Sequence, residues 1–288
     1  MKKNLIEKKK SSLTKEYIYL IFFISLSILF LITTIYFSRL FMNESKKSKP
    51  IKKVFNQKFD SSQDDRHIPV ISNVTEDEGA YITQGKHDIK NSKYYKYIDI
   101  YNMKSSGSLI LLENFKTYQQ TSEVTCGIAS LIMAIYYLDG TILNETDLAI
   151  RAKTDEHGTL CTNLEKVIVE LGYTYESKRN FTNGYIPTTN SSEFSKYIKE
   201  SLRNNESIII LSKDLAGHFT VIIGYDDMGT DYPHDDVIIL ADPYDTNDHI
   251  SDGFTIFSYE RYYAQMEGNF ADEYENLYFN KIKRKNKS

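Results

Sequence analysis

Apolar residues in the second half of the chain follow a helical spacing first and an alternating spacing afterwards. Between residues 126 and 138 they recur every three or four positions, which predicts a helix that Thr125 would cap and Asp139-Gly140 would end. Helices are also expected over 145–153, 163–171 and 193–203, and strands over 109–112, 174–177, 207–211, 218–225, 236–242 and 254–257. This order predicts an α+β fold in which N-terminal helices pack on an antiparallel sheet.

Residues 17–37 form a run of 21 residues without a charge. A helix of this length spans roughly 30 Å, the thickness of the hydrocarbon core of a bilayer. The alternative is a cleaved signal peptide, but the run is too long and no small-x-small cleavage site follows it. We expect a single transmembrane anchor. Lysine and arginine flank both ends, and a short basic N-terminal tail favours a cytoplasmic N-terminus and an extracellular domain.

The rest of the chain divides by composition. Residues 1–16 are a basic tail that we expect on the cytoplasmic side, and 38–105 are polar and predicted to be a tether. The folded domain is expected over 106–275, followed by a second basic tail over 276–288. A hydrophobic content of 41% is enough to form a core, and a net charge of −4 argues against a nucleic-acid partner.

The chain has two cysteines, Cys126 and Cys161, which is too few for a disulfide framework or a structural zinc site. Cys126 opens the predicted helix 126–138, and the positive end of a helix dipole stabilises a thiolate. Gly127 would leave room for a substrate backbone. The alternative is a buried structural cysteine, the commonest fate of a lone thiol.

Two glutamines precede this cysteine. Gln120 lies six residues before Cys126, and its amide could donate a hydrogen bond to a developing oxyanion together with the Cys126 N–H. Gln119 could compete for this role, and both could instead be ordinary loop residues.

A thiolate nucleophile requires a base, and His218 is the histidine that begins an apolar strand. If strands 218–225 and 236–242 form a hairpin centred on Thr230, His218 lies opposite Asp242, although the register could slip by two. A carboxylate there would orient the imidazole. Alone, Asp242 could equally be a turn residue.

Four segments together resemble the C39 and C39-like cysteine peptidases: QTSEVTCGIASLIMAIYYL, HGTLCTNLEKVIVELGY, GHFTVIIGYDD and VIILADPYD, over residues 109–266. The resemblance implies a papain-like fold with Cys126 as nucleophile, His218 as base, Asp242 as its orienting partner and Gln120 at the oxyanion hole. It implies a peptide or protein substrate and no cofactor. Many members are fused to ABC exporters and trim double-glycine leaders, but this sequence has no GxxxxGK[ST] motif.

Three questions stay open at this point. Cys161 could be a bystander or form a disulfide with Cys126 that would silence the site. The chemistry could be acyl transfer or cell-wall amide hydrolysis, or the domain could be an inactive binding module. The acidic loop does not match the EF-hand spacing, so a solvated turn is expected there; its residues are Asp242, Asp245, Asn247, Asp248 and Asp252.

Overall fold

The computed structural model describes residues 65–72, 79–83, 88–177, 190–267 and 277–284, together with scattered positions between 17 and 33. The chain divides into two compact units, residues 1–48 and 49–288. In the first unit the scattered described positions are helical. Most of the predicted span 17–37 lies outside the described residues, and the described part contains no helix long and apolar enough to cross a membrane.

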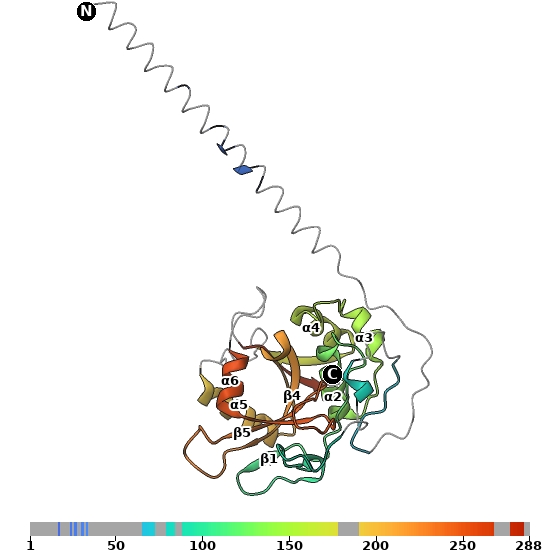
Figure 1. Ribbon diagram of the computed structural model, residues 1–288. Coiled ribbons are helices and arrows are strands. Elements are labelled where there is room, and N and C mark those ends of the chain that lie inside the picture. The colour runs from blue at the N-terminus through green and yellow to red at the C-terminus, as the bar shows by residue number, and fades with distance from the viewer. Residues whose placement is uncertain are drawn as a thin grey trace, which may run out of the picture. The chain divides into compact units, whose positions relative to one another are not determined.

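In the second unit, the described strands form one antiparallel sheet in the order β2-β7-β3-β4-β5-β6, and β1 pairs with the far end of β4 (Figure 1). The strands are β1 Leu109–Leu111, β2 Tyr173–Ser177, β3 Ile208–Ser212, β4 His218–Asp226, β5 Val237–Ala241, β6 Phe254–Ser258 and β7 Phe279–Arg284. The expected α+β class and antiparallel sheet are therefore confirmed.

The helices cover both faces of this sheet. They are α2 Cys126–Asp139, α3 Glu145–Arg151, α4 Cys161–Glu170, α5 Ser191–Arg203 and α6 Tyr259–Met266, with short 3₁₀ turns at Ala80–Thr83, Ile100–Asn102 and Asp214–Ala216. The Phe219 ring lies against Gly127 of α2, whereas the next residue, Thr220, hydrogen-bonds Tyr262 of α6. Because successive side chains of a strand point to opposite faces, α2 and α6 pack on opposite sides of β4. In Figure 1, α3 and α4 lie near α2, and α5 lies beside α6.

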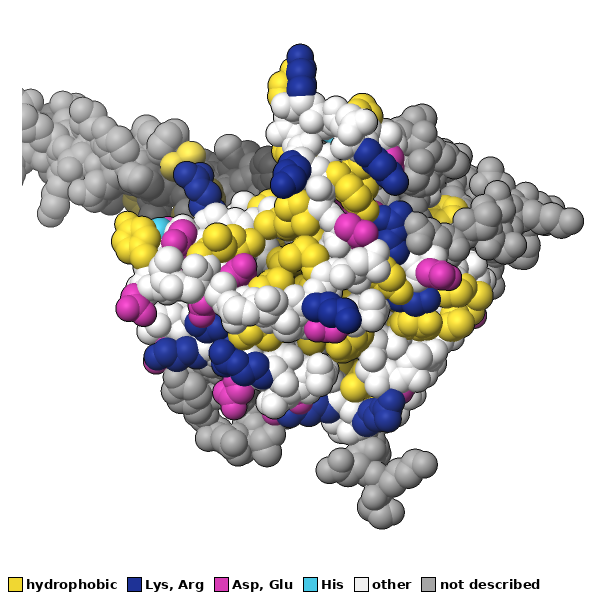
Figure 2. Space-filling model, turned by 90° about the horizontal axis from the view of Figure 1, so that it is seen from below, with side chains coloured by type: hydrophobic (Ala, Val, Ile, Leu, Met, Phe, Trp, Pro, Cys, Tyr) yellow, Lys and Arg dark blue, Asp and Glu magenta, His cyan; other side chains and the backbone are white. Residues whose placement is uncertain are grey.

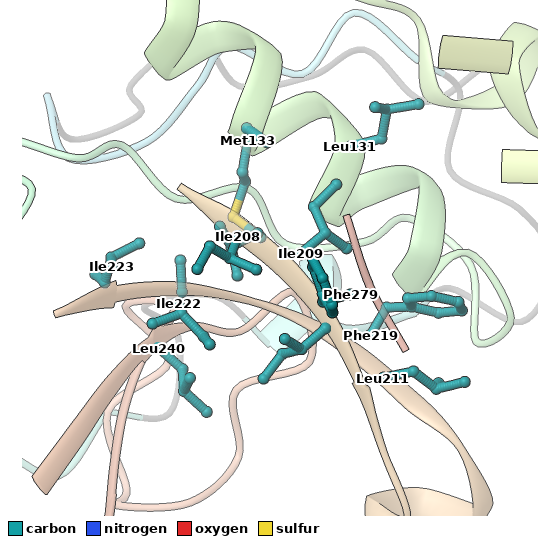
Figure 3. Close-up of a cluster of buried hydrophobic side chains, with 14 of the residues drawn as sticks. Leu131, Met133, Ile208, Ile209, Leu211, Phe219, Ile222, Ile223, Leu240 and Phe279 are labelled. Carbon is teal, nitrogen blue, oxygen red and sulfur yellow. The ribbon is translucent and has the colours of Figure 1, made fainter. Parts of the chain in front are cut away.

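The core lies between α2 and the central strands. The first ten residues of α2 are all buried, so this helix is more deeply enclosed than its amphipathic pattern suggested. Figure 3 shows Leu131 and Met133 of α2 above isoleucines of β3 and β4. A helix packed this tightly fixes the position of its first residue, Cys126.

Two segments differ from the expected organisation. Residues of the predicted C-terminal basic tail form β7, which lies between β2 and β3. Phe279 is buried there, and the Lys281 ammonium is neutralised by Glu176 at 3.0 Å and Glu206 at 2.8 Å. The glutamates on neighbouring elements neutralise the lysine, so a basic segment can form a strand of the sheet.

The predicted tether also contributes to this unit. Ile68 is fully buried, and the backbone N–H of Ile68 donates to the Thr117 carbonyl at 2.8 Å. Tyr95 packs edge-on against His249. Parts of residues 65–105 therefore pack on the folded domain, although their composition is polar.

The surface carries charges of both signs. On the face seen from below Figure 1, lysine and arginine side chains alternate with aspartate and glutamate around a central group of apolar side chains (Figure 2). The charge on this face is therefore mixed, consistent with a net charge of −4 for the whole chain.

Candidate active site

Cys126 is the first residue of α2 and is buried. Thr125 occupies the N-cap position, but its hydroxyl donates to the Ser122 carbonyl at 3.0 Å and does not cap the helix. The first N–H groups of a helix have no partner inside it and carry the positive end of its dipole. Cys126 therefore lies at the positive end of the α2 dipole. The predicted helix end at Gly140 is confirmed by its left-handed conformation.

Two contacts join α2 to the first residues of β4. A Cβ at Gly127 would lie 3.1 Å from the Phe219 ring, and the Ser130 hydroxyl donates to the Phe219 carbonyl at 3.0 Å. Phe219 follows His218 directly, so these contacts bring the histidine beside the start of α2. The small size of Gly127 makes room for Phe219; the expectation that it makes room for substrate has no support in this packing.

His218 and Asp242 are joined by a short hydrogen bond, with 2.6 Å between imidazole Nε2 and carboxylate Oδ1. Both side chains are about 5% exposed or less. The same Asp242 oxygen accepts the backbone N–H of Tyr244 at 2.8 Å. A carboxylate anchored in this way can hold the imidazole in one orientation.

The strand register around this pair differs from the expected one. Val221 pairs with Ala241 and Ile222 with Leu240, and the register shifts between Ile222 and Gly224. Continuing this pairing places Asp242 opposite Thr220, two residues from His218. A shift of two keeps both side chains on the same side of their strands, so the predicted contact forms between diagonal neighbours.

The His218 imidazole also hydrogen-bonds the side chain of Cys126. Burial by itself lowers the pKa of His218, but the Asp242 carboxylate and the Cys126 sulfur raise it to about 10. The histidine is therefore protonated at neutral pH beside the cysteine. The arrangement can hold a thiolate–imidazolium pair, which is a nucleophile with a proton donor next to it.

The two glutamines have different surroundings. The Gln119 amide donates to the Asp242 carbonyl at 2.8 Å and accepts the Asp245 N–H at 3.3 Å, so it braces the loop after β5. Gln120 is buried, and its Nε2 donates to the Ser122 carbonyl at 2.7 Å. Since an amide nitrogen carries two hydrogens, Gln120 retains a second donor. Of the two residues, Gln120 is the better candidate for an oxyanion.

Glu145, at the start of α3, is a site-supporting residue that the sequence analysis missed. Its buried carboxylate accepts the Tyr118 hydroxyl at 2.9 Å and the N–H and hydroxyl of Thr121 at 3.0 and 2.7 Å. Burial raises the pKa of Glu145, and the hydrogen bonds from Thr121 and Tyr118 oppose this. In the sequence, Glu145 is an acidic residue in the first turn of a helix, which indicates only a favourable interaction with the helix dipole. It does not indicate contacts with Tyr118 and Thr121.

Cys161 begins α4 and is buried, and neither cysteine forms a disulfide. The alternative in which Cys161 blocks Cys126 is therefore not the arrangement found. Nearby, the Thr159 side chain lies 3.4 Å from a Cβ built on Gly127. The Gly-Thr segment before α4 thus packs on the start of α2.

The carboxylates of the acidic loop after β5 bind N–H groups of the loop itself and the side chain of Arg66. Asp245 accepts the Gly253 N–H at 3.0 Å, Asp252 accepts the Phe254 N–H at 3.1 Å, and Arg66 lies 3.7 Å from Asp252. Within the described ranges, no three His, Cys, Asp or Glu side chains are placed to hold a metal ion. The loop is a turn held by internal hydrogen bonds.

Comparison with known proteins gives a match to the model of one family over residues 112–270, described as the Peptidase_C39 like family. No match with a curated protein was found. Among solved structures, the chain is similar to the peptidase domain of Streptococcus ComA, a bi-functional ABC transporter involved in quorum sensing. The identity is 19%, the TM-score 0.39, and 59% of this chain and 99% of that one are covered.

A second similar structure is a double-glycine motif protease from an AMS/PCAT transporter in complex with a leader peptide, with 18% identity, a TM-score of 0.36, and coverage of 58% and 91%. The third is the peptidase domain of Streptococcus mutans ComA, with 18% identity, a TM-score of 0.30, and coverage of 57% and 97%. The family match alone covers more than half of the chain and confirms the resemblance seen in the sequence. The chain belongs to the Peptidase_C39 like family.

Proposed function

We propose that this protein is a membrane-anchored cysteine peptidase in which Cys126, His218 and Asp242 hydrolyse peptide bonds, with Gln120 at the oxyanion hole. Membership of the family indicates a cysteine peptidase. The observation that carries the residue assignment is the position of His218, which hydrogen-bonds Asp242 on one side and Cys126 on the other. A nucleophile, a base and an orienting carboxylate in contact are the set that acyl transfer to a thiol requires.

The reaction would begin with attack of the Cys126 thiolate on the carbonyl carbon of the scissile peptide. A C–S bond forms, and the carbonyl oxygen becomes an oxyanion that the Cys126 N–H and the Gln120 amide stabilise. The His218 imidazolium gives its proton to the leaving nitrogen as the C–N bond breaks. Neutral His218 then takes a proton from water, the hydroxide attacks the thioester, and the C–S bond breaks, which releases the carboxylic acid and restores the Cys126 thiolate beside the His218 imidazolium.

Two cysteines of similar burial allow a matched test of the nucleophile. A thiol-reactive peptide electrophile should label the wild-type protein at neutral pH, and peptide mass mapping should place the label on Cys126. Cys126→Ala should abolish labelling and the cleavage of a proteome-derived peptide library, whereas Cys161→Ala should retain both. Labelling that survives Cys126→Ala would contradict the assignment.

The same experiment separates the rival functions. Cleavage products that gain water indicate hydrolysis, whereas products joined to an added amine indicate a transamidase. A reduced Cys126 that reacts with no electrophile would favour a binding module on a peptidase fold.

Membrane anchoring is supported by the sequence of residues 17–37, whose 21 uncharged residues match a bilayer in length. The basic N-terminal tail favours a single-pass protein of the cell membrane with an extracellular catalytic domain. The full chain should stay in the membrane fraction after alkaline carbonate extraction, and a variant lacking residues 1–37 should not. Protease added to intact cells should reach the domain; complete protection would reverse the orientation.

A further inference from the structure

A segment that precedes the family match lies along the loop that carries Gln120. We call residues 65–72 and 79–81 the strap. The Thr117 N–H donates to the Arg66 carbonyl at 3.0 Å, and the Tyr81 N–H donates to the Gln120 carbonyl at 2.9 Å. The family match begins only at residue 112. The strap is therefore an addition to the matched domain that contacts its candidate active site.

The strap approaches the Gln120 loop closely at Gly79. A Cβ built there would lie 2.5 Å from the Gln120 carbonyl oxygen and 2.5 Å from the Ser122 nitrogen. Both atoms belong to the backbone, so they cannot move aside by a change of rotamer. Gly79 also has a φ of +49°, which residues with a side chain rarely adopt. Only glycine allows the strap to lie directly on the Gln120–Ser122 peptides.

The strap completes the fixation of Gln120. The Gln120 N–H donates to the Pro243 carbonyl at 2.9 Å, in the turn directly after Asp242, and its carbonyl accepts from the strap. The next residue, Thr121, is bound by the Glu145 carboxylate, and the Glu145 N–H donates to the hydroxyl of Ser72 in the strap. Gln120 is thus held from the side of Asp242 and from the side of the strap.

We propose that the strap is a positioning element of the active site, in which Gly79 and the Tyr81 N–H hold Gln120 where its amide meets the oxyanion. This inference rests on the proposed function. A displaced donor weakens stabilisation of the transition state but leaves the thiolate intact, because the Cys126–His218–Asp242 contacts do not involve the strap. The strap also makes the part of the chain before the domain a contributor to turnover.

Gly79→Ala is the direct test, and Gly107→Ala is its matched control. Gly107 also has a positive φ, +60°, but a Cβ there meets nothing within 4 Å. Both variants therefore carry similar backbone strain, and only Gly79→Ala collides with the Gln120 loop. The first measurement is alkylation of Cys126 by iodoacetamide, which requires a thiolate but no oxyanion hole. The second is kcat and KM for a peptide found in the library screen.

For Gly79→Ala we expect kcat to fall by about 10- to 100-fold, with KM and the alkylation rate near those of the wild type. Gly107→Ala should resemble the wild type in all three. An unchanged kcat in Gly79→Ala would overturn the proposal, as would an equal loss of alkylation and turnover. A wild-type protein whose Cys126 is not alkylated, or that cleaves no peptide, would overturn the proposed function and the strap's role with it.

If Gly79→Ala does not fold, Tyr81 provides a second pair of variants. Tyr81→Pro removes the N–H that donates to Gln120, whereas Tyr81→Ala keeps it. A lower kcat in Tyr81→Pro than in Tyr81→Ala, at equal alkylation rates, would support the strap. Equal kcat values would overturn it.

Discussion

Oδ1 of Asp242 lies 2.6 Å from Nε2 of His218, although the two residues are not directly opposed in the β4–β5 pair. The contact runs diagonally across the strands and buries both side chains. The Asp242 carboxylate supplies the negative charge that keeps the His218 imidazole protonated beside Cys126. The consequences for pH can therefore be tested by removing that charge.

Asp242→Asn should move the alkaline limit of activity to lower pH. Burial lowers the pKa of His218, whereas the charge of Asp242 and the contact with Cys126 raise it to about 10. Asparagine keeps an oxygen acceptor but not the charge, so the imidazolium that protonates the leaving group is lost at lower pH. The measurement is kcat/KM for a cleaved peptide as a function of pH.

Two further variants frame this result. Asp242→Ala removes the acceptor as well, and we expect kcat to fall by about 100-fold because the imidazole loses its orientation. Asp231→Asn, in an exposed loop, should leave the profile unchanged. An alkaline limb of Asp242→Asn that coincides with that of the wild type would show that the carboxylate charge does not control His218.

The same shift predicts a pH dependence of stability. The pKa of His218 is raised on folding from 6.5 to about 10, so the folded state binds this proton more tightly than the unfolded state. The resulting stabilisation is fully present below pH 6.5 and is lost as the pH rises toward 10. Denaturant unfolding of the wild type and of His218→Gln at pH 6, 8 and 10 should show their difference in free energy shrinking. A constant difference would contradict the shift.

The sequence predicted the helix of Cys126 and its end at Gly140 because a regular apolar period and a glycine stop are local signals. The β4–β5 register was wrong by three residues next to the turn, because the hairpin is centred after Thr230, and by two, the slip that the sequence left open, beyond the irregularity between Ile222 and Gly224. Gly224 is a sequence signal for this irregularity, because a glycine inside a strand often marks a bulge. In the structure a Cβ at Gly224 would lie 2.7 Å from Leu111.

Other features have no local signal. β7 was interpreted as a tail because its lysines find Glu176 and Glu206 only in the folded chain. The strap binds largely through backbone groups at Thr117 and Gln120, which residues of most types could supply; only Gly79 is required by its close contact with the Gln120 loop. Order and spacing were enough to identify Cys126, His218 and Asp242 as candidates that the fold brings together, whereas the residues that support them depend on the tertiary structure.

Glu145→Ala should destabilise the domain by about 2–3 kcal/mol, because the Thr121 N–H and the Tyr118 hydroxyl would be left buried without their acceptor. Glu145→Gln retains an oxygen and should cost less. Glu123→Ala, near the protein surface, is the control for loss of a carboxylate from the same region; its partner is the Tyr244 hydroxyl. Thermal and denaturant unfolding measure the differences. A Glu145→Ala variant as stable as Glu123→Ala would show that the Glu145 network does not stabilise the fold.

Ser130→Ala tests the link between α2 and β4. The Ser130 hydroxyl is fully buried and donates to the Phe219 carbonyl at 3.0 Å, one turn along the helix from Cys126. Its loss leaves a buried carbonyl without this donor, which should lower the free energy of unfolding by about 1–3 kcal/mol. Because Phe219 adjoins His218, the iodoacetamide reaction of Cys126 should also slow as the thiolate–imidazolium contact loosens. Ser192→Ala, on the exposed face of α5, should change stability by less than about 0.5 kcal/mol and leave alkylation unchanged. If Ser130→Ala matched Ser192→Ala in both measurements, the buried hydroxyl would not be what holds the cysteine helix against the histidine strand.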